Sequence, residues 1–447
     1  MSGAQLQFGG ARVVVAGMGK SGLAALELLA GKGARLRATD IKPLAELPGV
    51  AELGVPFAVQ SPEVFRDADI IVISPGVACD LEPLEEARRR GVAVIGELEL
   101  AGYFLQGPVI GITGANGKTT TTALAGHILR QCGIPVQVGG NIGTPPASMV
   151  RSSRADQWNV LELSSFQLET IDRFRARVGA CLNVTPDHLD RHHSFEIYAA
   201  AKRRLFETQQ AGDFAILNAE DAASAGYAPH TPAQARWFSS SRRIEPGAWL
   251  EGGRILLDGE HLMDAAQVPL RGRHNLENVM AAALASSIAG APIEGIAAAV
   301  GGFPGVEHRL ELVRSVSGVD FYNDSKATNV DATLKALAAF ERGLWVILGG
   351  KDKGSDYAPL IEPLRAKARA VLLIGAAAGK IASHLGSCVP LIGAGVIDAA
   401  VRQAYAQAAP GDTVLLAPAC ASFDQFTSFE HRGRVFKDLV RRLEPKE

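Results

Sequence analysis

Two glycine-rich turns, each placed between an apolar run and a helical pattern, constrain the fold of this chain more than any other feature. The first, Gly-Met-Gly-Lys-Ser-Gly at residues 17–22, follows the apolar run 12–16. The second, Gly-Ile-Thr-Gly-Ala-Asn-Gly-Lys-Thr-Thr at residues 111–120, begins inside the apolar run 109–113. A turn of this kind points backbone N–H groups out of the N-terminus of the next helix, where nucleotide phosphates bind. Each turn therefore predicts an α/β domain with a phosphate site.

Apolar runs and helical patterns alternate along most of the chain. Continuous apolar strands separated by helices are typical of parallel sheets covered on both faces. We expect short hairpins in residues 230–270 and a linker at the Gly- and Pro-rich residues 301–305. We expect helices at 21–31, 82–90, 118–131 and 276–289, and strands at 12–16, 35–39, 68–74, 92–95, 109–113, 159–163, 180–184, 214–218, 344–348, 370–374 and 413–417.

The length of 447 residues suits three domains, at roughly 100–200 residues for each. The predicted fold class is therefore α/β with three domains. Residues 1–97 would form a Rossmann-like domain around the first turn, and residues 98–305 a P-loop ATPase-like domain with a parallel sheet around the second. Residues 306–447, where the α/β alternation resumes, would form a second Rossmann-like domain.

Composition excludes several classes of partner. Lys and Arg number 45 and Asp and Glu 47, a net charge of −2, which argues against a broadly basic nucleic-acid-binding surface. No apolar run approaches the roughly 20 residues of a membrane-spanning helix, and the N-terminus does not have the pattern of a signal peptide. The five cysteines are scattered, as is typical of reduced thiols. We expect a soluble, cytoplasmic monomer with no nucleic-acid partner and no membrane insertion.

The residues of the first turn leave its nucleotide open. Asp40 ends the next predicted strand, where a carboxylate binds a ribose in NAD-binding domains. Lys20 and Ser21 would suit the phosphate oxygens of any nucleotide. The alternative is a tight turn needed only for packing.

The second turn predicts an ATP site more strongly. The motif is GxxGKT from Gly114, because Ile112 occupies the position of the first glycine in the full P-loop pattern. Lys118 would reach the β- and γ-phosphates, and the Thr119 hydroxyl would bind Mg²⁺. Glu162 ends an apolar run and would be the metal-holding acid that a P-loop needs, although a lone Glu there is more often a surface or capping residue.

Several polar residues have no clear role from the residues alone. The segment 183–193 is rich in His and Asp, but its spacing matches no zinc signature, and His188 could serve a second hard cation or the substrate. Lys202 lies in a helical pattern and would by itself be a solvated lysine. Residues 323–329 form a polar turn after an apolar run, where ligand-binding and turn-forming roles are equally open.

Taken together, these strings resemble the Mur ligase family, the ATP-dependent ligases that build the peptidoglycan stem peptide. GxxGKT, the pair His308-Arg309 and residues 323–329 resemble the family in general. Three longer strings resemble the branch that adds D-glutamate to UDP-N-acetylmuramoyl-L-alanine: Gly-Gly-Asn-Ile-Gly at 139–143, Glu-Leu-Ser-Ser-Phe-Gln-Leu-Glu at 162–169 and Ala-Cys-Ala-Ser-Phe-Asp-Gln-Phe at 419–426. The resemblance spans nearly the whole chain.

The resemblance implies a set of binding residues. It implies that the first turn holds uridine diphosphate rather than NAD, with UDP-sugar contacts from Lys20, Ser21, Asp40, Ile41, Lys42, Gly76, Asn141 and His188. It implies ATP contacts from Gly114, Asn116, Gly117, Lys118, Thr119, Thr120, Asn275, Asn278, Arg309 and Asp324. It implies D-glutamate contacts from Thr328, Lys353, Ser422, Phe423 and Phe429.

This chain departs from the family pattern at two points. Ile41-Lys42 stands where family members commonly have Thr-Arg after the aspartate. Lys351 and Asp352 stand where a glycine-rich run usually precedes the lysine that matches Lys353.

The resemblance also implies the chemistry. ATP would phosphorylate the alanyl carboxylate, and the amine of D-glutamate would attack the acyl phosphate. Lys118, His188, Lys202 and Lys353 would be the catalytic residues. Two Mg²⁺ ions are implied, the first held by Thr119 and Glu162 and the second by His188 and a carbamylated Lys202. A sister Mur ligase, a folylpolyglutamate-synthetase-like ligase, a nucleotide-binding regulator without turnover and a dehydrogenase remain as alternatives.

Overall fold

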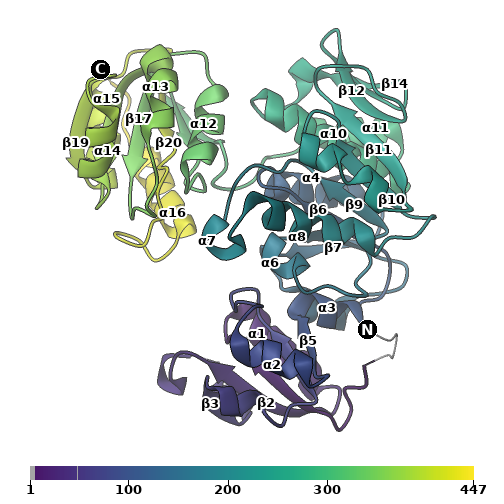
Figure 1. Ribbon diagram of the computed structural model, residues 1–447. Helices are drawn as coiled ribbons and strands as arrows, with labels where there is room; N and C mark the ends of the chain where they lie inside the picture. Colours follow the sequence, from purple (N-terminus) through teal and green to yellow (C-terminus); the bar gives the residue numbers. More distant parts are fainter. Residues whose placement is uncertain (1–5, 48, 447) are drawn as a thin grey trace. The chain divides into compact units, whose positions relative to one another are not determined.

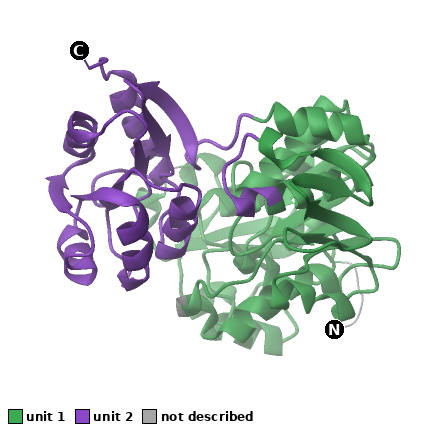
Figure 2. Cartoon of the chain, turned by 90° about the horizontal axis from the view of Figure 1, so that it is seen from above, with its two compact units in different colours: residues 1–268, 277–303 green, residues 269–276, 304–447 purple. Residues whose placement is uncertain are grey.

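The computed structural model describes residues 6–47 and 49–446, which fall into two compact units (Figure 2). The first unit comprises residues 1–268 and 277–303, and the second comprises residues 269–276 and 304–447. The chain leaves the first unit between Phe303 and Pro304, within the Gly- and Pro-rich residues 301–305. The domain bounds at 97/98 and 305/306 stay predictions.

The first sheet of unit 1 is parallel and has the order β3-β2-β1-β4-β5 (Figure 1). The chain adds strands to one side of β1 and then crosses to the other, so a crevice opens where β1 and β4 lie side by side. Val13 and Val15 pack into one hydrophobic core, and Val14 and Ala16 into another on the opposite face. The strands are β1 Arg12–Ala16, β2 Arg35–Asp40, β3 Phe57–Val59, β4 Ile70–Ile73 and β5 Ala93–Gly96, and the helices are α1 Lys20–Ala30, α2 Glu82–Arg89 and α3 Glu97–Gly102.

The central sheet of unit 1 has nine strands in the order β14-β13-β12-β11-β10-β9-β6-β8-β7. It is parallel from β7 to β12 and antiparallel at β13 and β14. Its strands are β6 Val109–Thr113, β7 Val136–Gly140, β8 Trp158–Glu162, β9 Val178–Cys181, β10 Phe214–Asn218, β11 Gln234–Ser239, β12 Gly247–Glu251, β13 Arg254–Leu257 and β14 Glu260–Asp264. The helices are α4 Lys118–Gln131, α5 Pro146–Met149, α6 Ser165–Leu168, α7 Leu189–His192, α8 Phe195–Glu207, α9 Ala222–Ala225, α10 Arg273–Ile288 (its first four residues in unit 2) and α11 Ile293–Gly301.

The sheet of unit 2 has the order β15-β16-β20-β17-β18-β19, and only β15 is antiparallel to its neighbour. Along the central strand β17, Val346 and Leu348 face one core while Trp345 and Ile347 face the other. The strands are β15 Glu311–Val316, β16 Val319–Asn323, β17 Leu344–Gly349, β18 Ala368–Ile374, β19 Leu391–Gly395 and β20 Thr413–Leu416, and the helices are α12 Val330–Ala338, α13 Ile361–Lys367, α14 Ala378–Leu385, α15 Ile397–Gln407 and α16 Phe429–Arg441. Short 3₁₀ helices in the chain lie at Leu44–Glu46, Ala51–Leu53, Pro62–Phe65, Val150–Ser152, Ala228–His230, Ala265–Gln267 and Ala358–Leu360.

The predicted α/β class and the parallel sheets are confirmed, and two local predictions are corrected. The strand expected at 180–184 is β9, which ends at Cys181 because the chain then turns over the second glycine-rich turn, where Asn183 O accepts from Ala115 N at 2.8 Å. The hairpins expected in 230–270 are limited to β12, β13 and β14, because β11 pairs in parallel with both β10 and β12. Among the described residues, no helix combines the length and apolar character that crossing a membrane requires.

Candidate active site

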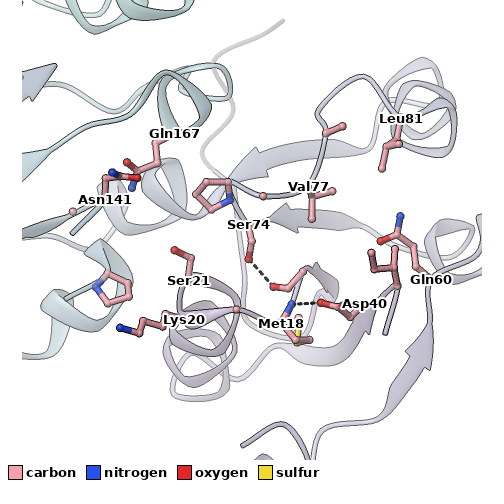
Figure 3. A pocket seen from close by; sticks show the side chains of 18 of the residues that line it. Met18, Lys20, Ser21, Asp40, Gln60, Ser74, Val77, Leu81, Asn141 and Gln167 are labelled. Carbon is pink, nitrogen blue, oxygen red and sulfur yellow. Dashed lines mark hydrogen bonds between the residues drawn. The ribbon is translucent and has the colours of Figure 1, made fainter. Parts of the chain in front are cut away.

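A cavity of about 560 Å³ opens at the crevice of the first sheet, beside the first glycine-rich turn (Figure 3). Asn141, directly after β7, and Gln167, on α6, also line it. Of the predicted UDP-sugar contacts, those that line the cavity are Lys20, Ser21, Asp40, Ile41, Gly76 and Asn141, whereas Lys42 and His188 do not. Gln60 and Gln167, which also line it, were not predicted, although Gln167 lies in one of the strings that carry the resemblance.

The first turn is held in one shape by close backbone packing. A Cβ atom on Gly22 would lie 1.9 Å from Gly17 O, and Ser74 Oγ donates to that same oxygen at 2.6 Å. Asp40 accepts from Met18 N at 2.6 Å and from Lys42 N at 3.0 Å. Each carboxylate oxygen keeps a second lone pair, which leaves Asp40 able to accept from a ribose hydroxyl as well.

The start of α1 can bind an anion. Gly19 precedes the helix, no side chain caps its N-terminus, and Gly19, Lys20 and Ser21 line the cavity. Uncapped N–H groups at a helix N-terminus, with a lysine beside them, suit a phosphate or pyrophosphate.

The second turn has the geometry of a phosphate-binding loop. Gly117 has a φ of 86°, and a Cβ atom there would lie 2.3 Å from Asn278 Oδ1. Lys118, the first residue of α4, folds back so that Nζ donates to Gly114 O at 2.8 Å and to Ala115 O at 2.9 Å. Asn183 Oδ1 accepts from Asn116 N at 2.9 Å and so braces the loop from the end of β9. The ammonium group thus lies over the loop, where phosphate oxygens would replace the carbonyl oxygens as its partners.

A hydroxyl and a carboxylate meet directly beside this loop. β6 and β8 are neighbours, so Thr119 Oγ1 donates to Glu162 Oε2 at 2.8 Å. Both side chains are buried, and Asn141 Nδ2 donates to Glu162 Oε1 at 3.0 Å. Asn141 therefore connects the cavity at the first turn with the carboxylate at the second.

The Thr119 hydroxyl and the Glu162 carboxylate suit a Mg²⁺ ion that also binds nucleotide phosphates. They are too few for a metal ion that is held by protein side chains alone. Mg²⁺ in nucleotide sites takes one or two carboxylates, a hydroxyl, waters and the phosphates of the substrate. Thr119 and Glu162 supply the hydroxyl and one carboxylate at a single point. Within residues 6–47 and 49–446, no group of three or more His, Cys, Asp and Glu side chains is placed to hold a metal.

Lys202 is buried, so its interpretation as a solvated helix lysine is wrong. Its side chain lies on α8 with 1% of its surface exposed, and Nζ donates to Gly114 O at 2.9 Å. The ammonium group also lies 4.6 Å from the centre of the Tyr198 ring. Burial, together with repulsion from Lys118, lowers the pKa of Lys202 to about 7. A periodic pattern could not show this, because α8 presents this face to the P-loop only in the folded chain.

His188 and its neighbours form a second cluster near α6. His188 has a φ of 53° just before α7, and its ring packs 4.9 Å from that of Phe166. His192, one helical turn further, is buried and contacts Ser165 Oγ at 2.9 Å and Glu169 Oε1 at 3.2 Å. These contacts fix α7 against α6 and give His192 a structural role that its sequence pattern did not predict.

The residues predicted to bind D-glutamate lie in unit 2. Lys351 forms an antiparallel bridge with Ala421, which brings the turn that carries Lys353 next to the segment that carries Ser422 and Phe423. The Ser422 hydroxyl is buried and has no hydrogen-bond partner among the described residues, whereas Phe423 is exposed.

Arg432, which was not predicted from the sequence, joins the polar turn at residues 323–329 to the segment at residues 419–426. It is fully buried on α16 and donates to Ser325 Oγ at 2.9 Å, Ser325 O at 2.8 Å and Cys420 O at 3.2 Å. Its signal in the sequence is only an arginine in an amphipathic helix, which is usually solvated.

The predicted ATP residues are divided between the units. Gly114, Asn116, Gly117, Lys118, Thr119, Thr120 and Asn278 lie in unit 1, and Asn275, Arg309 and Asp324 in unit 2. In unit 2, Asp324 is buried and burial raises its pKa to about 6, against the opposing effect of Arg309.

Comparison with known proteins decides the family. Three family models match: the Mur ligase MurD-like N-terminal domain at residues 11–96, the Mur ligase middle domain at 112–286 and the Mur ligase glutamate ligase domain at 308–420. A UDP-N-acetylmuramoylalanine--D-glutamate ligase of Solibacter usitatus is 67% identical over 98% of this chain and 99% of its own length. The chain belongs to the Mur ligase family. An enzyme of the same name from Acidobacterium capsulatum is 50% identical over 97% of both chains.

Solved structures agree with this Mur ligase in fold. The UDP-N-acetylmuramate-alanine ligase MurC of Thermotoga maritima matches with a TM-score of 0.61 and 18% identity, covering 96% of this chain and 99% of that one. A pseudomurein peptide ligase type C from Methanothermus fervidus matches with a TM-score of 0.60 and 18% identity, covering 97% of this chain and 99% of that one. Mur ligases use ATP and Mg²⁺ and act on small-molecule substrates.

Proposed function

We propose that this Mur ligase joins D-glutamate to UDP-N-acetylmuramoyl-L-alanine with hydrolysis of ATP to ADP and phosphate, a step of peptidoglycan synthesis. The observation that carries the proposal is the contact of Asn141 with Glu162, at 3.0 Å. It joins a nucleotide-sized cavity to a P-loop, so one long substrate can bind at the first turn and present its far end beside ATP. The two relatives carry the name of this activity.

The long substrate would lie with its uridine diphosphate against α1. The uncapped N-terminus of α1, Lys20 and Ser21 offer donors to the pyrophosphate, and Asp40 an acceptor to the ribose. The alanyl carboxylate at the other end would lie near Asn141, beside Glu162 and the P-loop. Ile41, Lys42, Gly76 and His188 complete the proposed UDP-sugar set.

The first Mg²⁺ would be held by Thr119 and Glu162, and the second by His188 and Lys202. When bound, these ions offset the charge of the phosphates and the attacking carboxylate. The second site requires Lys202 to become anionic by carbamylation. Its neutral amine attacks CO₂, a C–N bond forms, and one proton leaves to solvent. The low pKa of Lys202 supports this step, because the neutral amine is well populated near pH 7.

The reaction would then run in two steps. The alanyl carboxylate attacks the γ-phosphorus, ADP leaves, and an acyl phosphate forms. Lys118 exchanges the carbonyl oxygens of Gly114 and Ala115 for phosphate oxygens and stabilises the charge that moves to ADP. The neutral amine of D-glutamate attacks the acyl carbonyl, and a C–N bond forms. The C–O bond to the phosphate breaks, phosphate leaves, and the nitrogen gives up one proton to solvent.

In unit 2, Thr328, Lys353, Ser422, Phe423 and Phe429 would bind D-glutamate, with the buried Ser422 hydroxyl donating to a carboxylate. Of the proposed ATP contacts, Asn278 and the P-loop residues belong to unit 1, and Asn275, Arg309 and Asp324 belong to unit 2.

We further propose that the protein acts as a monomer in the cytoplasm. Its five cysteines are free, as thiols remain in a reducing compartment. The cavity and the P-loop both belong to unit 1, so neither needs a second copy of the chain. A dimer mass by light scattering at assay concentration would contradict the monomer.

Phosphate release with UDP-N-acetylmuramoyl-L-alanine and a panel of amino acids tests the activity. We expect turnover with D-glutamate, and the product mass should equal the two substrates joined with loss of water. Turnover with an L-amino acid or a diamino acid but not with D-glutamate would indicate a sister Mur ligase. Phosphate release that never yields a joined product would contradict ligase activity.

A further inference from the structure

The turn that follows β17 packs tightly on the segment that carries Ser422. A Cβ atom on Gly350 would lie 2.2 Å from Ala421 O, so only glycine permits this approach. Lys351 N donates to Ala421 O at 2.8 Å, and Ala421 N donates to Lys351 O at 3.1 Å. The backbone of the turn is therefore fixed at residue 351. The position of Lys353 then depends on the contacts of the residues that follow Lys351.

Asp352 holds those residues through three contacts. Its Oδ2 accepts from Lys380 Nζ, on α14, at 2.8 Å. Its Oδ1 accepts from the Tyr357 hydroxyl at 2.8 Å and from Ser355 N at 3.2 Å. The hydrogen bond from Lys380 holds the pKa of Asp352 at about 2, so the carboxylate is ionised at any working pH. One side chain thus closes the turn on itself and fastens it to a neighbouring helix.

The same contacts reach the segment that carries Ser422. Tyr357 is fully buried, and its hydroxyl lies 3.0 Å from Cys420 Sγ. An ionised carboxylate only accepts, so the single hydroxyl hydrogen of Tyr357 goes to Asp352, and the Cys420 thiol donates to the tyrosine oxygen. Burial raises the pKa of Cys420, which keeps that thiol protonated. A chain of hydrogen bonds therefore runs from Cys420 through Tyr357 to Asp352.

The charges around the turn show why this carboxylate must be held. Lys351 and Lys353 are exposed on either side of Asp352. D-Glutamate carries two carboxylates and one ammonium group, so an unpaired carboxylate in this turn would repel it. The ion pair with Lys380 offsets the charge of Asp352, and among the described residues neither exposed lysine has an ion-pair partner.

We propose that Asp352 is a positioning residue for the amino-acid substrate, which it serves by fixing the 351–353 turn against Lys380, Tyr357 and Cys420 so that Lys353 meets a substrate carboxylate. The inference rests on the proposed function, which places D-glutamate at Lys353 and Ser422. Asp352 itself does not touch the substrate.

The variant Asp352→Asn separates positioning from simple electrostatics, because the two accounts predict opposite signs. Asn keeps the shape of Asp and an acceptor for Tyr357 but loses the ion pair, and it makes the turn more positive by one charge. If Asp352 acted only through its charge, the KM for D-glutamate would fall. We expect it to rise about tenfold, with the KM values for ATP and the nucleotide sugar within about twofold of the wild type, because a charge-assisted hydrogen bond is lost.

Asp356→Asn is the matched control. It removes the same charge from the same loop, where Asp356 accepts from His384 Nδ1 at 3.0 Å and from Ala358 N at 3.0 Å, whereas Lys380 forms its ion pair with Asp352. The KM for D-glutamate should stay within about twofold of the wild type. An equal rise in both variants would overturn the proposal, since any loosening of the loop would then suffice.

A double-mutant cycle with Lys380→Met tests the ion pair itself. Both single variants and the double variant should raise the KM for D-glutamate to a similar extent, because each breaks the same contact. Independent, multiplying effects would contradict the ion-pair mechanism. Thermal unfolding of each full-length variant within about 2 °C of the wild type will show that the effect is not a loss of folded protein.

Failure of the inference and failure of the proposed function are distinguishable. If the wild-type protein does not use D-glutamate, the proposed function fails. If the wild type uses it and Asp352→Asn leaves the KM unchanged or lowers it, the positioning role fails while the proposed function stands.

Discussion

The hydroxyl of Thr119 donates to the carboxylate of Glu162 at 2.8 Å, and both side chains are buried. Thr119 is the second residue of α4, the helix after the P-loop, and Glu162 ends β8, 43 positions later in the chain. Two oxygen donors directed at one point beside a phosphate loop are what Mg²⁺–nucleotide binding needs.

Replacing Thr119 by Val should abolish most activity. Val has the shape of Thr without the hydroxyl, so the proposed Mg²⁺ ligand is lost, and Glu162 keeps Asn141 as a donor but loses Thr119. We expect kcat/KM to fall about 100-fold or more, as for the loss of one group that stabilises transition-state charge. Thr119→Ser keeps the hydroxyl and should retain activity within a few-fold. Steady-state kinetics over a Mg²⁺ titration measures both, and an active Val variant would remove Thr119 from the metal site.

Replacing Lys202 by Ala should stop turnover, and a short carboxylic acid should restore part of it. The acid supplies the anionic oxygens that the carbamate would provide in the buried space beside Gly114. Arg203→Ala is the control, because that side chain pairs with Glu207 on the same helix, at 2.7 Å. A ¹³C-NMR carbamate signal from ¹³CO₂ should appear in the wild type and vanish in Lys202→Ala. Its absence from the wild type would contradict the carbamate.

Gly22→Ala should impair nucleotide-sugar binding. The added Cβ would lie 1.9 Å from Gly17 O, so the first turn must open and lose its shape. We expect the KM for the nucleotide sugar to rise at least tenfold, with a loss of about 1–3 kcal/mol in stability from overpacking. Gly31→Ala places the same methyl group at the end of the same helix, no closer than 3.5 Å to Leu28 O, and should be near neutral. Equal KM values for Gly22→Ala and the wild type would rule out the turn as the UDP site.

Glu97→Gln should raise stability at pH 8 and change it less at pH 5. Glu97 is buried, its Oε1 accepts from Ala147 N at 2.6 Å, and burial raises its pKa from 4.5 to about 7. Between these values the folded protein binds more protons than the unfolded one, so stability falls as the pH rises. The shift corresponds to about 3 kcal/mol, and the Gln variant should lose this dependence.

Denaturant unfolding at pH 5, 6, 7 and 8 provides the measurement for Glu97→Gln. Glu99→Gln, on the same helix, is the control with the opposite sign. Glu99 accepts from the backbone N–H groups of Asp172, Arg173 and Phe174, so its loss should destabilise the protein at every pH. A pH slope for Glu97→Gln equal to that of the wild type would contradict the prediction.

Local patterns predicted much of the fold. β6, α4 and β10 begin and end where apolar runs and helical periodicity placed them, because each has a regular pattern and is bounded by a glycine-rich turn or a polar residue. Strands β3, β7, β15 and β19 were not predicted, since β3 is short and the others contain exposed or only half-buried positions. The apolar run expected before residues 323–329 is β16. β11 looked like part of a hairpin because strand direction depends on the neighbouring strand, which periodicity does not reveal.

The sequence by itself determined the two phosphate turns, the Lys118-Thr119 pair after the second and the apolar strands that lead into both, because these features lie within a few residues of one another. Only the tertiary structure decided that Asn141 bonds to Glu162, that Lys202 is buried against Gly114, and that Asp352 is held by Lys380. The partners in these contacts are 21, 88 and 28 residues apart, respectively. Strand order and helix packing bring such residues together, and burial then changes their chemistry, as the lowered pKa of Lys202 shows.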